Sequence, residues 1–321
     1  MKFTRPLAMA ILATAIAVPA SAQTFGLATN PQGSLYHRVG VAVAKLFNDK
    51  LGIKARVQPF SGTSTYIPLL NENEIQTGII NVSDSVKAPA GTGAFEGRPQ
   101  PNIRMLSVLF PLPFSLLVPA DSPIKSIREI KGHRIPNAFT SQTTIADLQE
   151  AVLANAGLKP SDIVGYPVPN VFKGAESLGD GKVDGAMTAA GIAAIQKSHI
   201  KLRGRGGVRF VPIDTSPEAV ARMSAVVPSR VLMLNPAKNL PGVVAPTPMM
   251  AFLAFLAAND KMTDEQAYKI VKLLHDSKPE LVKMTRILSR FDPDGMTFNF
   301  KAKWHPGAIK FYKEVGQWPP K

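Results

Sequence analysis

The sequence contains no cysteine. Disulfides, thiolate zinc sites, iron–sulfur clusters and cysteine nucleophiles are therefore all excluded. Aromatic residues are scarce at 7%, so any packed core must consist mainly of aliphatic side chains. Because 45% of the 321 residues are hydrophobic, the chain has enough apolar material for a folded body, and its length favours two domains.

Common catalytic motifs are absent too. The chain has no Gly-x-Ser-x-Gly, no phosphate-binding Gly-x-x-x-x-Gly-Lys-Ser/Thr and no His-Glu-x-x-His. The five histidines do not pair at a zinc-site spacing, and Asp292 to Gly295 favours a turn over a calcium loop. A hydrolase or transferase stays open as an alternative if Asp84, Asp180 or Asp184 converge with a histidine.

Residues 1–22 have the pattern of a secretory signal peptide. Lys2 and Arg5 precede an uncharged apolar run from Leu7 to Val18, and Ala20-Ser21-Ala22 supplies small residues before a cut after Ala22. The run is about a dozen residues, whereas a membrane span needs roughly 20. We therefore expect a cleaved, cofactor-free, monomeric protein in a bacterial periplasm.

The balance of charge is basic. Without Lys2 and Arg5 the formal net charge falls from +14 to +12, which favours an anionic partner. Nucleic acid is not expected in that compartment. The one basic glycine-rich stretch, Arg203 to Gly207, is too short and too poor in aromatics to stack bases.

Short apolar runs alternate with helical patterns, as in parallel α/β units. The spacing predicts strands at 24–29, 54–60, 77–82, 103–109, 163–168, 183–189, 208–213 and 249–257. Helices are expected from 35, 67, 126, 145, 172, 217, 263 and 306. The pattern divides into lobe 1, residues 23–115 plus 235–321, and lobe 2, residues 116–234.

Hydroxyl and amide residues gather where strands pass into helices. In open α/β sheets ligands bind at this edge, where helix starts present unpaired N–H groups. These turns carry Gln32 to Tyr36, Ser61 to Tyr66 and Thr140 to Thr143. Each Ser or Thr could simply cap its own helix, but three such turns in both lobes favour a shared ligand cleft.

Several segments together resemble one family. They are the run Gly33 to Leu46, Val57 to Pro68, Gly91 to Phe95, Asp121 to Ile127, Lys131 to Pro136, Ala154 to Leu158, Val168 to Val171, and the ending Trp304-His305-Pro306-Gly307-Ala308-Ile309-Lys310-Phe311-Tyr312-Lys313-Glu314. This ordered set resembles the TAXI family of solute-binding proteins, the extracytoplasmic receptors of tripartite ATP-independent periplasmic (TRAP) transporters. The resemblance covers nearly the whole chain after residue 22.

The resemblance implies an α/β fold of the type II periplasmic-binding-protein type: two lobes, each a mostly parallel sheet flanked by helices, with a cleft between them. It also implies a receptor, not an enzyme, with TRAP membrane permease subunits as partners. The family's cleft positions fall here on Gly33, Ser34, Tyr36, Ser61, Gly62, Thr63, Tyr66, Ser141, Gln142 and Thr143.

The chain departs from the family at two of these positions. Many members have Gly-Ser-Gly-Thr in place of Thr140 to Thr143, and an Asn in place of Tyr66. The larger side chains predict a reshaped cleft. The positive charge and the helix dipoles favour an organic anion, a small carboxylate, with Asn170 or Lys173 reaching it from lobe 2; a neutral solute could use the same donors.

One rival receptor has the same architecture. The binding protein of an ABC importer, such as a sulfonate or thiamine-precursor binder, differs only in the permease that it meets. The sequence alone leaves this alternative open.

Overall fold

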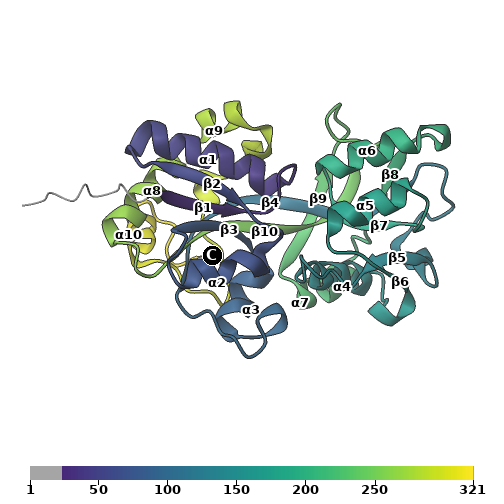
Figure 1. Cartoon of the computed structure of the whole chain (residues 1–321), viewed down its shortest axis with the longest axis horizontal. Coiled ribbons are helices and arrows are strands. Elements are labelled where there is room, and N and C mark those ends of the chain that lie inside the picture. Colours follow the sequence, from purple (N-terminus) through teal and green to yellow (C-terminus); the bar gives the residue numbers. More distant parts are fainter. Residues whose placement is uncertain (1–23, 321) are drawn as a thin grey trace, which may run out of the picture.

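The computed structural model describes residues 24–320 (Figure 1). The predicted signal peptide and its cut after Ala22 lie outside this range.

The chain alternates strands and helices. The strands are β1 Phe25–Thr29, β2 Ala55–Pro59, β3 Thr77–Asn81, β4 Ile103–Pro119, β5 Arg134–Asn137, β6 Val164–Pro167, β7 Ala186–Ala189, β8 Val208–Val211, β9 Ser229–Leu234 and β10 Thr247–Asn259. The helices are α1 Leu35–Leu51, α2 Thr63–Asn71, α3 Val82–Ala90, α4 Ile145–Asn155, α5 Val171–Gly179, α6 Ala193–Lys201, α7 Pro217–Val226, α8 Asp264–Asp276, α9 Lys278–Met284 and α10 Pro306–Glu314.

The first lobe, on the left of Figure 1, contains β1 to β3 with α1 to α3 and α8 to α10. β1 pairs in parallel with both β2 and β3, and β3 then pairs antiparallel with β10. Gly40 lets α1 approach the sheet closely, because a Cβ there would lie 2.4 Å from the Thr29 methyl group. The start of α1 is thereby held against the end of β1.

The second lobe contains β5 to β8 with α4 to α7, on the right of Figure 1. β5 and β6 form a separate parallel pair, whereas β7 and β8 both pair antiparallel with β4. The fold is the predicted mixed α/β type with two lobes, but its sheet is less parallel than expected. The two longest strands cause this difference, since they run in opposite directions through both lobes.

β4 and β10 join the lobes (Figure 1). They pair antiparallel from Ile103 with Asn259 to Phe114 with Met250, forming the centre of an eight-stranded sheet. β4 contains Pro111 and Pro113, and prolines are uncommon in a central strand. The Pro113 carbonyl accepts from Ala190 N at 2.9 Å, so its polar edge faces β7 and no hydrogen bond to β10 is lost.

The predicted lobe boundaries at 115 and 235 remain a prediction. β9 pairs with the first part of β10, residues 247–252. The loop between β9 and β10 lies beside β8, because Phe210 N of β8 donates to Gly242 O of the loop at 2.8 Å. The chain therefore keeps contact with the second lobe beyond 235 and returns to the first lobe along β10.

Candidate functional site

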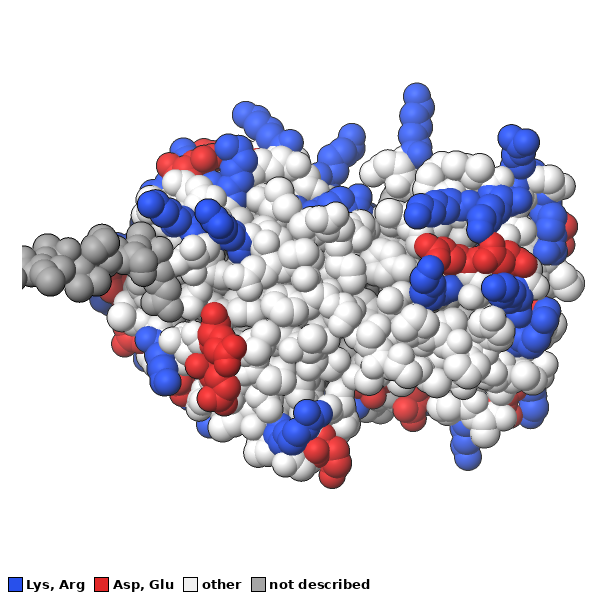
Figure 2. Space-filling model, in the orientation of Figure 1, with Lys and Arg blue, Asp and Glu red and all other residues white. Residues whose placement is uncertain are grey.

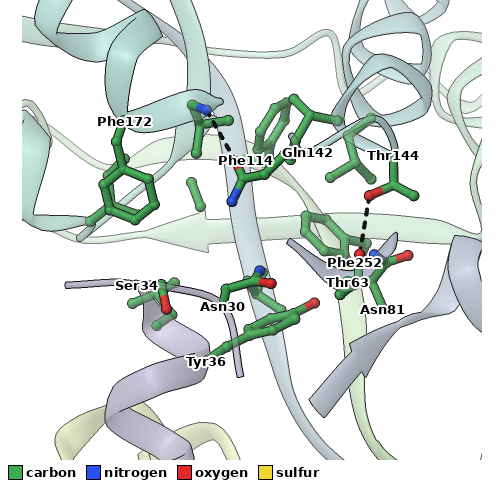
Figure 3. A pocket seen from close by; sticks show the side chains of 17 residues that line it. Asn30, Ser34, Tyr36, Thr63, Asn81, Phe114, Gln142, Thr144, Phe172 and Phe252 are labelled. Carbon is green, nitrogen blue, oxygen red and sulfur yellow. Dashed lines mark hydrogen bonds between the residues drawn. The ribbon is translucent and has the colours of Figure 1, made fainter. Parts of the chain in front are cut away.

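A small cavity lies between the lobes, in front of β4 and β10 (Figure 3). Its volume is about 60 Å³. We call it the front cavity. Its lining combines amide and hydroxyl groups with aliphatic and aromatic walls: Asn30, Ser34, Leu35, Tyr36, Thr63, Asn81, Leu112, Phe114, Gln142, Thr144, Ile145, Leu148, Val171, Phe172, Ala189, Ile192 and Phe252.

The turn after β1 supplies one side of the front cavity. Ser34 caps α1 by accepting from His37 N at 3.0 Å. The first turn of the helix places Tyr36 edge-on against Phe110, with 6.2 Å between the ring centroids. Asn30 lines the same side, and its buried Oδ1 has no hydrogen-bond partner among the described residues. A buried acceptor without a partner is costly, so this atom is suited to a donor on a ligand.

A second side comes from β3 and the helices α2 and α3. Asn81 caps α3 and donates from Nδ2 to Asp84 Oδ2 at 2.5 Å, while its Oδ1 accepts from Asp84 N at 2.9 Å. Asp84 lies behind this wall and is fully buried. Burial raises the pKa of the Asp84 carboxyl to about 7, and the Thr63 hydroxyl and Asn81 amide partly oppose that rise.

The second lobe closes the front cavity with the turn before α4 and the start of α5. Gln142 Oε1 accepts from Val171 N at 3.1 Å, which ties the two segments together (Figure 3). The Thr144 hydroxyl lies 3.3 Å from the Thr63 hydroxyl of the first lobe (Figure 3). Residues of both lobes thus meet across the cavity.

Aromatic side chains form the apolar walls. Phe114 of β4 and Phe252 of β10 pack edge to face, with 6.2 Å between their ring centroids, and both line the cavity. Phe172 faces Tyr36 and Ser34 from the second lobe in Figure 3. The walls leave little room for water, which strengthens any polar contact that a ligand makes inside.

Four further contacts hold the lobes together. Arg38 donates to Gly191 O at 2.5 Å, and Ala193 N donates to Gly33 O at 3.2 Å. On the other side, Asp147 of α4 accepts from Ser83 of α3 at 2.9 Å and pairs with Lys87 at 2.7 Å. The structure therefore represents the closed arrangement of the two lobes.

Electrostatically, the front cavity is uncharged at its lining: none of its 17 lining residues is Lys, Arg, His, Asp or Glu. Positive potential comes instead from helix starts. Ser34, Gly62 and Asn170 precede α1, α2 and α5, and the first N–H groups of a helix have no partner within it. Such a site can bind a single negative charge through backbone dipoles.

Four of the predicted site residues line the front cavity: Ser34, Tyr36, Thr63 and Gln142. Four others lie at its edge without lining it. Gly33 bonds to Ala193 as described, Ser141 bonds to Pro169 O at 2.9 Å, and Asn170 caps α5 by accepting from Lys173 N at 3.0 Å. A Cβ on Gly62 would lie 2.5 Å from Ser141 O, so only glycine permits this approach of the lobes.

The structure does not bring the remaining four to the cavity. Ser61 is exposed and bonds to Thr65, and Thr143 is also exposed. Tyr66 is fully buried inside the first lobe, where its hydroxyl donates to Ile79 O, so it supports β3 instead of forming a cleft wall. Lys173 points outward and pairs with Glu176 at 2.7 Å, because its place on α5 is on the solvent side.

Sequence reasoning missed three polar lining residues, Asn30, Asn81 and Thr144, and it also missed the apolar walls. Asn81 stands before Val82-Ser83-Asp84, a capping pattern with an acidic third residue, which could have revealed both α3 and the site residue. No such signal existed for Phe114 or Phe252, because an apolar residue in a strand looks the same whether it faces a core or a cavity.

One of the alternative catalytic pairs forms, but it lies away from the front cavity. Asp184 lies 3.5 Å from His133 Nδ1 and pairs with Arg134 at 3.0 Å on the second lobe, and neither Asp184 nor His133 lines the cavity. Asp180 pairs with Lys201. Asp84 lies in the first lobe, and the lining of the front cavity contains no histidine. Within residues 24–320 no three His, Cys, Asp or Glu side chains are grouped to hold a metal ion.

The architecture is that of the type II periplasmic solute-binding proteins. Solved structures with this fold include one described as a periplasmic transporter (13% identity, 92% of each chain covered, TM-score 0.55). Another is the aliphatic sulphonate-binding protein SsuA from Escherichia coli (15% identity, 93% of this chain and 94% of that chain, TM-score 0.51). A third comes from work on glutathione import by GshT and the cystine ABC importer TcyBC of Streptococcus mutans (16%, 84% and 96%, TM-score 0.52).

A family model narrows the class. The model described as the NMT1-like family matches residues 27–316, and the chain belongs to this family. The resemblance to the TAXI family stays a prediction. Between residues 24 and 320, no helix has both the length and the apolar character needed to span a membrane.

Proposed function

We propose that this protein is an extracytoplasmic receptor that captures a small carboxylate in the front cavity and delivers it to a membrane importer. One observation carries the proposal: the starts of α1, α2 and α5 meet at one closed cavity that both lobes line. A solute that touches both lobes favours the closed arrangement over an open one, and closure is a signal that a membrane partner can recognise.

The lining limits the chemistry of the solute. Helix starts can hold one carboxylate, but no cationic side chain is present in the lining to neutralise a second. The unpartnered Oδ1 of Asn30 calls for a donor elsewhere on the solute. The small volume of the front cavity, about 60 Å³, limits the solute to a small molecule. A carboxylate of two to four carbons with a hydroxyl or amino group fits these limits.

A binding series tests this chemistry. We expect glycolate, lactate and alanine to raise the melting temperature and to give saturable calorimetric titrations, with acetate weaker because it lacks the donor. A solute at about 100 times its dissociation constant stabilises by about 2.7 kcal/mol. If lactamide bound as tightly as lactate, the carboxylate assignment would fail while the receptor assignment stood.

The membrane partner is proposed from the similar structures. The Streptococcus mutans work concerns an ABC importer, which supports an ABC permease over the TRAP permease that the TAXI resemblance implies. Uptake into vesicles containing the cognate permease separates the two. Uptake that requires ATP hydrolysis supports the ABC partner, and uptake driven by an ion gradient alone supports the TRAP partner.

Absence of turnover distinguishes a receptor from an enzyme. We expect a bound solute to be recovered unchanged after long incubation with purified protein, because the front cavity lacks a histidine base. Mass spectrometry of the recovered solute is the measurement. Conversion of the solute would contradict the receptor function.

A further inference from the structure

A second hollow borders β4 beside the front cavity. Leu112 and Phe114 line the front cavity, whereas Phe110, Pro111 and Pro113 line this second space, and Leu35 lines both. Its volume is about 590 Å³, within the range of ligand sites. We call it the rear hollow.

Both lobes and the loop between β9 and β10 build the rear hollow. The first lobe contributes Arg38 of α1 and the 3₁₀ turn Arg286–Arg290. The second lobe contributes Ala190 and Gly191 after β7, and the loop contributes residues 235–240. The space therefore exists only while the two lobes keep this arrangement.

Four cationic side chains line the rear hollow and no acidic one does. They are Arg38, Lys238, Arg286 and Arg290. None of the four pairs with a carboxylate within residues 24–320, although many other Lys and Arg residues of the chain do. All four residues are exposed, and like charges without counter-charges repel, so a bound anion would relieve this repulsion.

The surroundings add to the need for an anion. Partial burial lowers the pKa values of the Arg38 and Arg290 guanidinium groups, because the charged form loses solvent. Asn235, Asn239 and Ser289 supply neutral donors beside the cations. Figure 2 shows Lys and Arg side chains along the upper edge of the molecule, on both sides of the notch between the lobes.

We propose that the rear hollow binds a free, small multivalent anion bearing carboxylate or phosphate groups. One guanidinium group can donate two hydrogen bonds to two oxygens of the same carboxylate or phosphate. The four cations of the rear hollow match three or four negative charges on one ligand. This ligand differs from the front-cavity solute in charge. By touching both lobes, it also favours the lobe arrangement shown here.

Calorimetric titration at fixed ionic strength tests the proposal, with citrate and pyrophosphate as probes and acetate as the monovalent comparison. We expect one saturable site for the multivalent probes, at which acetate does not compete. The double variant Arg286→Gln with Arg290→Gln should weaken binding at least tenfold. A matched double variant, Arg56→Gln with Arg203→Gln, removes the same charge from exposed positions outside the hollow and should leave affinity unchanged.

Three results would overturn the proposal. One is an equal loss of affinity in both double variants, which would indicate general charge attraction. Another is loss of pyrophosphate binding in Gln142→Ala, which would place the anion in the front cavity. The third is binding to vesicles of acidic lipid without binding to either soluble probe, which would make the cations a membrane contact.

Discussion

The front cavity and the rear hollow both border β4 between the two lobes, yet they differ in size and charge. The front cavity is small and lined by uncharged groups, and its positive potential comes from helix starts. The rear hollow is roughly ten times larger and its potential comes from four side-chain cations. Backbone dipoles suit a single charge, whereas several side-chain cations suit several charges.

The largest expected effect comes from the buried carboxyl behind the front cavity. Asp84 has a pKa of about 7 in the folded protein against 3.8 ordinarily, so the folded state keeps its proton where the unfolded chain has lost it. Stability should therefore fall as the pH rises from about 4 to 7, by an amount on the order of 4 kcal/mol. Urea unfolding of the protein and of Asp84→Asn across this range is the measurement.

The control for this prediction lies in the variant itself. The amide that Asp84→Asn introduces does not titrate, so the variant should lose much less stability over the same range. Parallel pH profiles for the two proteins would show that another group controls the response.

Closure of the front cavity depends on one glycine. Gly62→Val places a side chain within 2.5 Å of Ser141 O, so the lobes cannot meet as they do here. We expect the affinity for the front-cavity solute to fall about a hundredfold, equivalent to about 2.7 kcal/mol. Calorimetric titration checks this. Gly204→Val is the matched control, because a Cβ there meets nothing within 4 Å; an equal loss in that variant would refute the closure argument.

In the second lobe, Gln142 lines the front cavity and Lys173 lies on the surface, so variants of the two should differ in solute affinity. Gln142→Leu removes the acceptor of Val171 N and one polar group of the lining, so we expect about a tenfold loss of solute affinity. Lys173→Ala should leave the affinity unchanged, because its ammonium pairs with Glu176 in solvent. The reverse order of effects in titrations would restore Lys173 to the site.

The smallest effect concerns the contact between α3 and α4. Asp147→Asn weakens the pair with Lys87, which is partly exposed, so we expect a two- to fivefold loss of solute affinity. Asp49→Asn removes a comparable exposed pair within α1 alone. Only the first variant should change affinity and become less sensitive to salt. No difference between them would show that this pair does not stabilise closure.

Local patterns predicted much of the fold. Capping residues located helices: Thr263 accepts from Gln266 N at the start of α8, and Ser34 caps α1 as described. The predicted strand 103–109 covers only the first part of β4, because Pro111 and Pro113 argue against a central strand. The sequence does not show which edge of a strand each proline faces. The sequence pattern does not predict α3, which begins at the last residue of the predicted strand 77–82, is short and contains Pro89.

Tyr66 and Lys173 were predicted to bind the solute, but the structure places both side chains away from the front cavity. Each lies on a short helix whose first residues line or border the front cavity, and each has chemistry that suits a ligand. The direction of a side chain on a short helix depends on what packs against that helix, and this is a property of distant segments. Tyr66 therefore points to β3 and Lys173 points to solvent.

The sequence by itself determined the alternation of strands and helices and the polar turns between them, because hydrophobic spacing and helix caps act over a few residues. Only the tertiary structure decided which of those turns face each other and where the cations remain unpaired. Both outcomes depend on two long strands that bring residues more than a hundred positions apart into one sheet and so place the two lobes against each other.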